Sequence, residues 1–325
     1  MTKLDLKDRK ILYELDLDAR QSLTQIGKKV GLKKDVVSYR IKRMEDQGII
    51  KHFFTVIDTF KLGYNVFRIY LQLQDAPLDV RKEIVKYFVN YKNTWIVYSV
   101  TGPIDLGSVL WIKNINEFYQ FYDKLLDQYG KYFTQKIVSV YVQADEYEKT
   151  FLIADEIKNF ERKKFTILCD GVTVNIDNLD YKLLNEIALN ARIPLIELAE
   201  KLNTSSQTVH YRLENLIKTG VIKGFRVALD ISQLGLQCFD VRINLKDHAQ
   251  RKLIINYLKD NPYFKCLNTA IGYTDLELEF HITDMDKVNQ IIDELNVKFP
   301  EAIRNYIFLK TREVHKERWL PELDV

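Results

Sequence analysis

The sequence predicts an α+β fold built from two tandem copies of one unit, with a helical front part and a mixed rear part in each copy. Three observations predict this architecture: an internal repeat, a helical spacing of apolar residues at the front of each copy, and alternating strand-like and helix-like segments at the rear. The chain has 325 residues, of which 46% are hydrophobic and 29% are charged. That balance is typical of globular proteins and argues against disorder.

The repeat appears when the sequence is shifted by 172 positions. Of the 56 positions from 8 to 63, 19 are then identical without a gap. Further along, the shift becomes 170, which places Gly102 on Gly272 and Asp105 on Asp275. The predicted domains are two front domains at 1–63 and 176–235, two rear domains at 64–145 and 236–325, and a connector at 146–175.

The front of each copy has the apolar spacing of three helices. Asp5 and Asp177 stand just before the first apolar run and are the expected N-caps. The second helices are predicted at 23–30 and 195–202. Each copy therefore begins with two short helices that lead into a third.

The turn after the second helix needs a residue that tolerates a left-handed backbone. Gly31 occupies this place in the first copy and Asn203 in the second. In the second copy, Thr204 and Gln207 have the spacing of a capping box at the start of the third helix, whereas the first copy lacks this cap. The sequence therefore predicts a tight helix–helix turn in both copies.

The third helix carries the signal for DNA binding. Apolar residues at i, i+4 and i+7 predict its buried face: Val37, Ile41 and Met44 in one copy, Val209, Leu213 and Leu216 in the other. Its opposite face is polar and rich in hydrogen-bonding groups. This pattern is typical of a helix-turn-helix, whose second helix places side chains on base edges in the major groove. A plain three-helix bundle is the alternative. Segments 50–58 and 222–230, which follow the third helices, are each predicted to form the strand of a wing.

The rear of each copy has the order β-α-β-β-α-β, which is the ferredoxin-like motif. The predicted elements are 64–74, 79–91, 95–101, 106–112, 116–129 and 137–142, then 239–245, 250–260, 266–271, 276–282, 286–298 and 303–310. Two helices would cover one face of each sheet and leave the other face for a partner sheet. We therefore expect an intramolecular pseudo-dimer, with higher homo-oligomers left open. In the connector, strands are predicted at 151–153 and 165–168 and a short helix at 155–164.

Several motifs carry a family resemblance. The first front domain contains Leu4-Asp-Leu-Lys-Asp-Arg-Lys-Ile-Leu, Leu23-Thr-Gln-Ile-Gly-Lys-Lys-Val-Gly-Leu and Val37-Ser-Tyr-Arg-Ile-Lys-Arg-Met-Glu, and the rear domains contain the turns Gly102-Pro-Ile-Asp and Gly272-Tyr-Thr-Asp. Together they resemble the Lrp/AsnC family of prokaryotic transcription regulators. Members of that family usually carry one such unit per chain, and this chain carries two.

The resemblance implies a sequence-specific regulator that binds double-stranded DNA and responds to an amino acid or another small molecule, with no resident cofactor or metal. The implied reading-helix residues are Lys34, Asp35, Ser38, Tyr39, Ser206, Gln207, His210, Tyr211 and Asn215. The implied phosphate contacts are Arg40, Lys42, Arg43, Lys51, Arg212 and Lys223. Gly102, Asp105, Gly272 and Asp275 are candidate effector residues, although a turn glycine and an Asx cap explain them equally well.

The two front domains differ in charge. Residues 1–63 hold 14 Lys or Arg and nine Asp or Glu, a net of +5, whereas residues 172–235 hold seven of each. Phosphate neutralisation supplies most of the sequence-independent affinity for DNA. The first front domain is therefore expected to supply most of the affinity for DNA. The second is expected either to add more sequence-selective contacts or not to bind DNA at all.

Two other functions compete with this prediction. Some proteins of the superfamily decarboxylate sirohaem, and their resemblance rests on basic and His-containing motifs. Here the five histidines form no H-x-x-H spacing, and strand 95–101 offers only hydroxyls. The third possibility is an architectural protein that binds DNA without sequence preference. No phosphate loop, nucleophile elbow or metal-ligand spacing is visible, so no enzyme is predicted.

The remaining composition points to the cytoplasm. Cys169, Cys238 and Cys266 have no spacing typical of disulfide frameworks or zinc knuckles. The longest uncharged apolar-rich run, 93–104, is too short to cross a bilayer, and the N-terminus lacks a secretory signal. We therefore expect no membrane partner.

Overall fold

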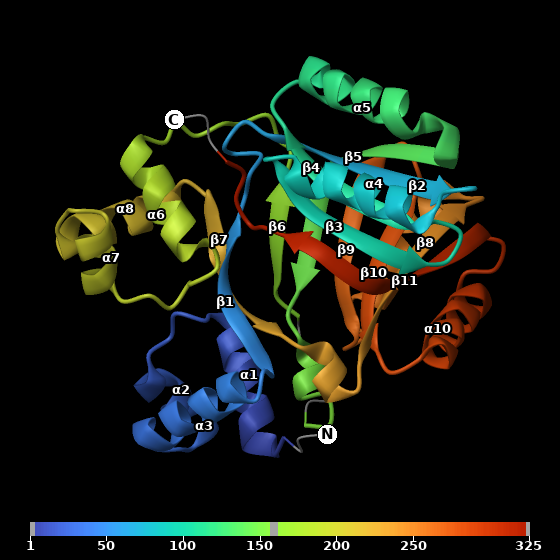
Figure 1. Ribbon diagram of the computed structural model, residues 1–325. Helices are drawn as coiled ribbons and strands as arrows, with labels where there is room; N and C mark the ends of the chain where they lie inside the picture. Colours follow the sequence, from blue (N-terminus) through green and yellow to red (C-terminus); the bar gives the residue numbers. More distant parts are fainter. Residues whose placement is uncertain (1–3, 157–161, 323–325) are drawn as a thin grey trace.

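The computed structural model describes residues 4–156 and 162–322. It places two helical heads beside a β-barrel that carries helices on its outside (Figure 1). The first head contains α1 (Leu6–Leu17), α2 (Leu23–Val30) and α3 (Lys34–Asp46), and the second contains α6 (Asn178–Ala188), α7 (Leu195–Lys201) and α8 (Ser206–Lys218). Within the described residues, no helix is both long and apolar enough to cross a membrane.

The helix starts follow from their capping residues. Asp5 and Asp177 cap α1 and α6 through capping boxes, as predicted. One expected cap is wrong: α8 is capped by Ser205, whose hydroxyl accepts from the Thr208 amide, and not by Thr204. The Thr204 amide bonds to a carbonyl of α7, which keeps that residue in the preceding turn.

The turns before the third helices have the predicted left-handed residues. Gly31 has φ +67° and Asn203 has φ +50°. Both residues reverse the chain at no large steric cost, because glycine and asparagine tolerate this conformation. The tight turn of a helix-turn-helix is therefore present in both heads.

The two heads are joined by a shared ribbon. β1 (Ile50–Ile57) and β7 (Ile222–Leu229) lie where wing strands were predicted, but they pair antiparallel with each other across the two heads. Apolar residues of both heads form one hydrophobic cluster around this ribbon. The heads therefore form one body.

The rear segments form β2 (Asn65–Leu73), α4 (Leu78–Asn90), β3 (Thr94–Thr101), β4 (Leu106–Ile112), α5 (Ile115–Tyr129) and β5 (Phe133–Tyr147), then β8 (Gln237–Leu245), α9 (Arg251–Leu258), β9 (Phe264–Ile271), β10 (Leu276–Ile282), α10 (Met285–Lys298) and β11 (Ile303–Glu317). Short 3-10 turns lie at Gly130–Tyr132, Ile231–Leu234 and His248–Gln250. The element order matches the predicted β-α-β-β-α-β motif in each copy.

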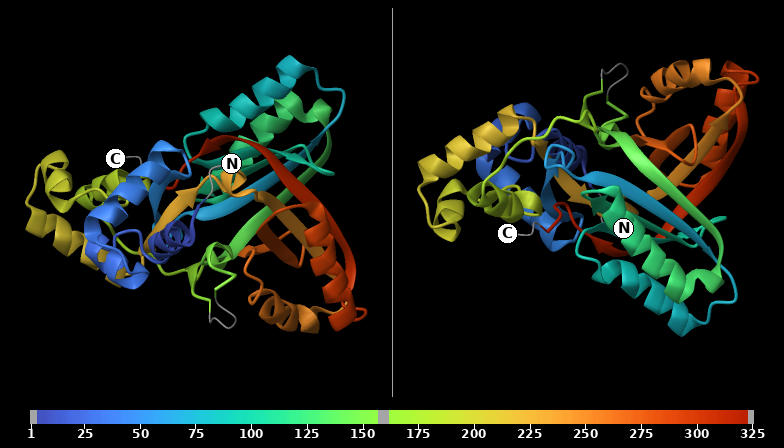
Figure 2. Two further views of the ribbon diagram at one scale, coloured as in Figure 1. Left: turned by 90° about the horizontal axis from the view of Figure 1, so that it is seen from below. Right: turned by 90° about the horizontal axis from the view of Figure 1, so that it is seen from above.

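Two strands are much longer than the sequence predicted, and they close the barrel. The first half of β5 pairs with β2 in its own copy, and its second half pairs with β9 of the other copy. In the same way, β11 pairs first with β8 and then with β3. The ladder therefore runs β2-β4-β3-β11-β8-β10-β9-β5 and returns to β2. Figure 2 shows the rear helices of the first copy (cyan to green) and those of the second copy (orange to red) on opposite outer sides of this barrel.

The connector differs from its prediction in one place. The strand at 165–168 is confirmed as β6 (Lys164–Leu168), which pairs with β5. The strand expected at 151–153 is instead a 3-10 turn, η2 (Thr150–Leu152), because Lys149 is drawn towards the first head by two bonds to Asp16. The helix expected at 155–164 falls mostly on residues outside the described ranges.

Candidate functional site

The third helices present polar faces to solvent. Their buried stripes are those predicted. The exposed side chains are Lys34, Asp35, Ser38, Tyr39 and Lys42 on α3, and Gln207, His210, Tyr211 and Asn215 on α8, with Ser206 half-buried. Tyr39 and Tyr211 are 67% and 72% exposed. The two tyrosines occupy matching positions of the repeat and are open to solvent on the faces predicted to contact DNA.

Two arginines predicted as phosphate contacts tie the first head together. Arg40 donates to Asp5 at 2.7 Å and to Asp8 at 2.8 Å, and Arg43 lies 2.6 Å from Asp8. Asp8 is almost fully buried, so these bonds satisfy its charge. The pairs hold α3 against the start of α1.

The second head repeats this arrangement. Arg212 donates to Asp177 at 2.7 Å and to Asp180 at 2.8 Å. Lys223 lies 3.3 Å from the buried carboxylate of Asp58 in the first copy. Of the remaining predicted phosphate contacts, Lys42 pairs with Asp46 one helical turn away, and Lys51 is exposed.

The Gly–Asp turns have a structural reason in both copies. The Asp105 carboxylate accepts from the Leu73 amide at 2.7 Å, and the Asp275 carboxylate accepts from the Leu245 amide at 2.7 Å. A Cβ on Gly102 would lie 2.6 Å from the Phe308 carbonyl oxygen, and one on Gly272 would lie 2.6 Å from that of Val138. Both glycines therefore allow a strand of the other copy to pass close by.

A cavity of about 380 Å³ lies between the ribbon and the barrel interior. One wall is aromatic and includes Trp95 and Trp111, which stack with ring centroids 5.5 Å apart. The sequence analysis did not single out this site. Its signal is the alternation of polar and apolar residues along Leu276-Glu-Leu-Glu-Phe-His-Ile, which is β10.

Charged side chains fill the barrel beside the cavity. Arg68 donates to Glu277 at 2.5 Å, and both are almost fully buried. Arg242 donates to the Tyr70 hydroxyl at 2.7 Å and lies 3.4 Å from Asp240. Arg68 and Glu277 pair across the two copies, whereas Arg242 and Asp240 pair within the second copy, so each buried charge has an opposite charge beside it.

The other end of the cavity brings together residues far apart in sequence. Cys238, Glu279 and His281 each place a possible ligand atom within 4.8 Å of the others. Lys265 lies 3.2 Å from Glu279 and 3.6 Å from Glu146. No spacing in the sequence predicted this cluster, because it forms only when β8, β9 and β10 pair.

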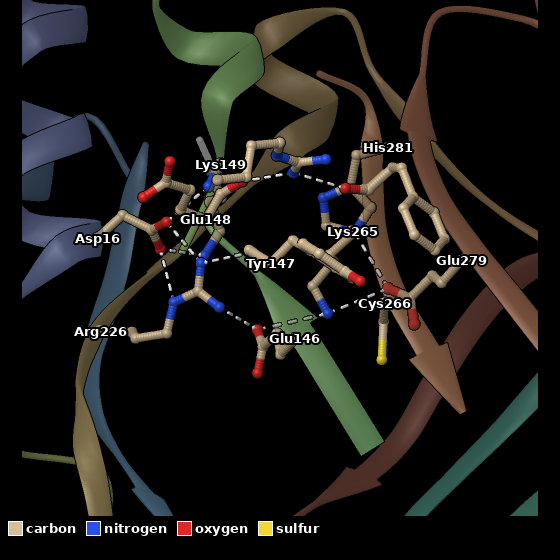
Figure 3. Close-up of polar contacts among 12 residues, drawn as sticks. Asp16, Glu146, Tyr147, Glu148, Lys149, Arg226, Lys265, Cys266, Glu279 and His281 are labelled. Atoms are coloured by element: carbon tan, nitrogen blue, oxygen red, sulfur yellow. Dashed lines mark hydrogen bonds and ion pairs between the residues drawn. The ribbon is translucent and has the colours of Figure 1, made fainter. Parts of the chain in front are cut away.

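A buried ionic chain leads from this cluster to the first head (Figure 3). Arg226 of β7 lies 3.0 Å from Glu146 and 2.5 Å from Asp16 of α1, and Lys149 lies 2.5 Å from the same Asp16 carboxylate. Burial alone would raise the pKa of Asp16, but the charges of Arg226 and Lys149 outweigh it and lower this pKa to about 2. Burial and the neighbouring Arg226 lower the pKa of Lys149 to about 8.

Known proteins resemble both the helical heads and the complete repeated unit of this chain. Residues 4–51 and 176–223 match a family model described as winged helix-turn-helix DNA-binding. An HTH-type transcriptional regulator of Pyrococcus furiosus is 31% identical over 128 residues, which are 39% of this chain and 83% of that protein. The regulatory protein AsnC of Haemophilus influenzae is 32% identical over 130 residues, 37% of this chain and 86% of that protein.

The whole chain also resembles a solved enzyme in fold. The crystal structure of the siroheme decarboxylase NirDL matches with a TM-score of 0.66 and 12% identity, covering 96% of this chain and 93% of that one. At this identity the likeness concerns the fold alone. It shows that a two-unit chain of this kind occurs elsewhere.

The two regulators and the repeated helix-turn-helix give the chain its family. Each regulator is matched over more than four fifths of its length by less than half of this chain. The chain carries the corresponding helix-turn-helix twice. It therefore belongs to the Lrp/AsnC family of HTH-type transcription regulators, with two units in one polypeptide.

Proposed function

We propose that the chain is a transcription regulator whose two heads read two unequal half-sites of one double-stranded DNA. The observation that carries this proposal is the pair of exposed polar helix faces, on α3 and α8, held in one body by the β1–β7 ribbon. A rigid pair of reading helices suits two half-sites at a fixed spacing. The regulator would act where the DNA is, in the cytoplasm.

The two faces differ in chemistry. α3 exposes Lys34 where α8 has Ser206, and Lys42 where α8 has Glu214. α8 offers Gln207 and other amide and imidazole groups, which pair with base edges. The first head therefore supplies sequence-independent affinity, and the second supplies discrimination.

Selection of binding sites from random duplex DNA with the purified chain tests the proposal. An enriched asymmetric site, protected over two adjacent segments in footprinting, is expected. The triple variant Gln207→Ala, His210→Ala, Asn215→Ala should lose protection over one segment only. No enriched sequence would indicate an architectural protein, and an unchanged footprint in the triple variant would show that the second head is silent.

An amino-acid effector at the two Gly–Asp turns is the finer part of the proposal. Each Asp carboxylate there already accepts a backbone amide, so a ligand amine would use its remaining lone pairs. Binding should raise the melting temperature by mass action. Asp105→Asn with Asp275→Asn keeps an acceptor for the amides and removes the charge, so this variant should stay folded and lose the shift. A complete amino-acid panel with no shift in the parent would argue against an effector here.

An enzyme of the siroheme-decarboxylase type is the second candidate. The cavity supports it, since Arg68, Arg242 and His281 line a space with stacked tryptophans on the other wall. Such an enzyme would bind a polyanionic tetrapyrrole. The purified chain would then show a tetrapyrrole absorbance band, or acquire one with added sirohaem, and would release carbon dioxide from it. Absence of both favours the regulator.

A further inference from the structure

The cluster at the polar end of the cavity is built on the inward face of three adjacent strands. Cys238 of β8 lies directly opposite His281 of β10 in the antiparallel ladder, and Glu279 stands two residues before His281 on the same face. Cys266 of β9 is opposite Glu279. A sulfur, an imidazole nitrogen and a carboxylate oxygen therefore project into one small volume.

The matching strands of the first copy have none of these groups. Counterpart positions, 172 residues earlier on β2 and 170 earlier on β3 and β4, hold Val66, Ile96, Val109 and Trp111 in place of Cys238, Cys266, Glu279 and His281. These residues are buried or partly buried and carry no thiol, imidazole or carboxylate, so the first copy has no set of metal-ligating groups at the matching positions. The polar set is thus not required to close the barrel.

Burial of the second set carries a cost that its internal bonds only partly offset. The His281 side chain is 9% exposed, and its Nδ1 has no hydrogen-bond partner among the described residues. Within the described part of the chain, the imidazole makes one polar contact, from Nε2 to Glu279 at 3.2 Å. An unpartnered buried imidazole nitrogen costs about 1–3 kcal/mol, and a ligand on Nδ1 would recover this cost.

The geometry points to a zinc-binding site formed by Cys238, Glu279 and His281, with its fourth position facing the barrel cavity. The possible ligand atoms lie within 4.8 Å of one another. Around a tetrahedral zinc ion, ligand atoms stand roughly 3.3–3.8 Å apart, so rotamer adjustments of about 1 Å bring all three onto the ion. Three protein ligands from a thiolate, an imidazole and a carboxylate, with one open position, are typical of zinc sites that also take a water or a small ligand.

The charged groups around the site can rearrange to accept a metal ion. Glu279 pairs with Lys265 at 3.2 Å. Lys265 is also 3.6 Å from Glu146, so the ammonium group keeps a carboxylate partner after Glu279 turns to the metal. Binding displaces one proton from the Cys238 thiol to solvent, because only the thiolate is a ligand.

Titration of the full reduced chain with Co²⁺ tests the site, because cobalt replaces zinc and a cobalt–thiolate bond gives an intense near-ultraviolet charge-transfer band. One equivalent per chain should produce this band and the visible bands of a tetrahedral ion, and Zn²⁺ should bleach both. Cys238→Ser should abolish the charge-transfer band. The control Cys169→Ser changes an exposed thiol in the connector and should leave the band unchanged.

A second variant covers the case in which Cys238→Ser does not fold. Glu279→Gln keeps the thiol and should weaken zinc binding at least tenfold, with far-ultraviolet circular dichroism confirming the fold. No charge-transfer band in the parent chain, or a band that persists in Cys238→Ser, would overturn the site. The readout is independent of DNA, so a chain that binds metal but selects no DNA sequence would count against the proposed regulator and leave the metal site standing.

Discussion

Arg226 of the second copy and Asp16 of the first form a fully buried, two-bond ion pair. Arg226 Nε donates to one carboxylate oxygen at 2.9 Å and Nη2 donates to the other at 2.5 Å. Asp16 lies on α1 in the first head, and Arg226 lies on β7 opposite Phe54 of β1. The pair therefore links the first head to the β1–β7 ribbon. Because Arg226 also pairs with Glu146 of β5, it links that head to the barrel as well.

Removing the Asp16 charge should be strongly destabilising. Asp16→Asn removes the carboxylate that pairs with both Arg226 and Lys149. Arg226 keeps Glu146 as a partner, but the ammonium of Lys149 stays buried without its paired carboxylate, for an expected loss of about 3–5 kcal/mol in the free energy of unfolding. Urea denaturation measures it. The matched control is Asp46→Asn, which breaks the exposed pair with Lys42 and should cost no more than about 0.5 kcal/mol. A loss below 1 kcal/mol for Asp16→Asn would contradict this account.

The same carboxylate should give the stability a defined acid dependence. The pKa of Asp16 is lowered from 3.8 to about 2 in the folded chain, so its contribution is complete above about pH 4 and is lost as the pH falls towards 2. The difference between parent and Asp16→Asn should therefore shrink by about 2 kcal/mol over this window. Denaturation of both proteins at stepped pH tests it. A constant difference from pH 5 to pH 2 would argue against the shift.

The close strand crossing at Gly102 should not accept a side chain. Gly102→Ala adds a Cβ 2.6 Å from the Phe308 carbonyl oxygen, at a φ of +146°. The expected loss is about 1–3 kcal/mol from the clash in addition to backbone strain. Gly171→Ala is a control for a positive φ without a clash, since Gly171 has φ +75° and nothing lies within 4 Å of its added Cβ. Equal melting temperatures for the two variants would show that the crossing is not tight.

The salt dependence of DNA binding should separate the two heads. Lys51 is an exposed residue of the first head and a predicted phosphate contact, so Lys51→Ala should weaken binding to all sequences and reduce the log–log salt slope by about 0.9. Lys51 is a cleaner probe than Arg43, which also pairs with Asp8. Gln207→Ala should change which sequences bind and leave the slope nearly unchanged. Fluorescence anisotropy over a salt series measures both effects. The reverse pattern would show that the roles proposed for the two heads are wrong.

The first unit alone should not remain a monomer. Residues 1–145 lack β7, β9 and β11, so β1, β3 and β5 would each expose an unpaired edge. Exposed edges pair with other chains, so dimers or aggregates are expected. Light scattering coupled to size exclusion measures the mass. A well-folded monomer at high concentration would show that the two units do not depend on each other.

The sequence by itself determined the repeated unit and the local structure within each copy. Apolar spacing placed Val37, Ile41 and Met44 on the buried stripe of α3, and Gly31 and Asn203 at the left-handed turns, because these features depend on residues only a few positions apart. The order of helices and strands followed for the same reason.

Only the tertiary structure decided how the copies combine. The second halves of β5 and β11, the pairing of β1 with β7, and the meeting of Cys238 with His281 all join residues of different strands or copies. A ladder partner is chosen by packing and hydrogen bonding over the whole barrel, and a single strand carries no record of it. The ion pair of Arg226 with Asp16 belongs to the same class, since each charge alone is indistinguishable from a solvated one until burial brings them together.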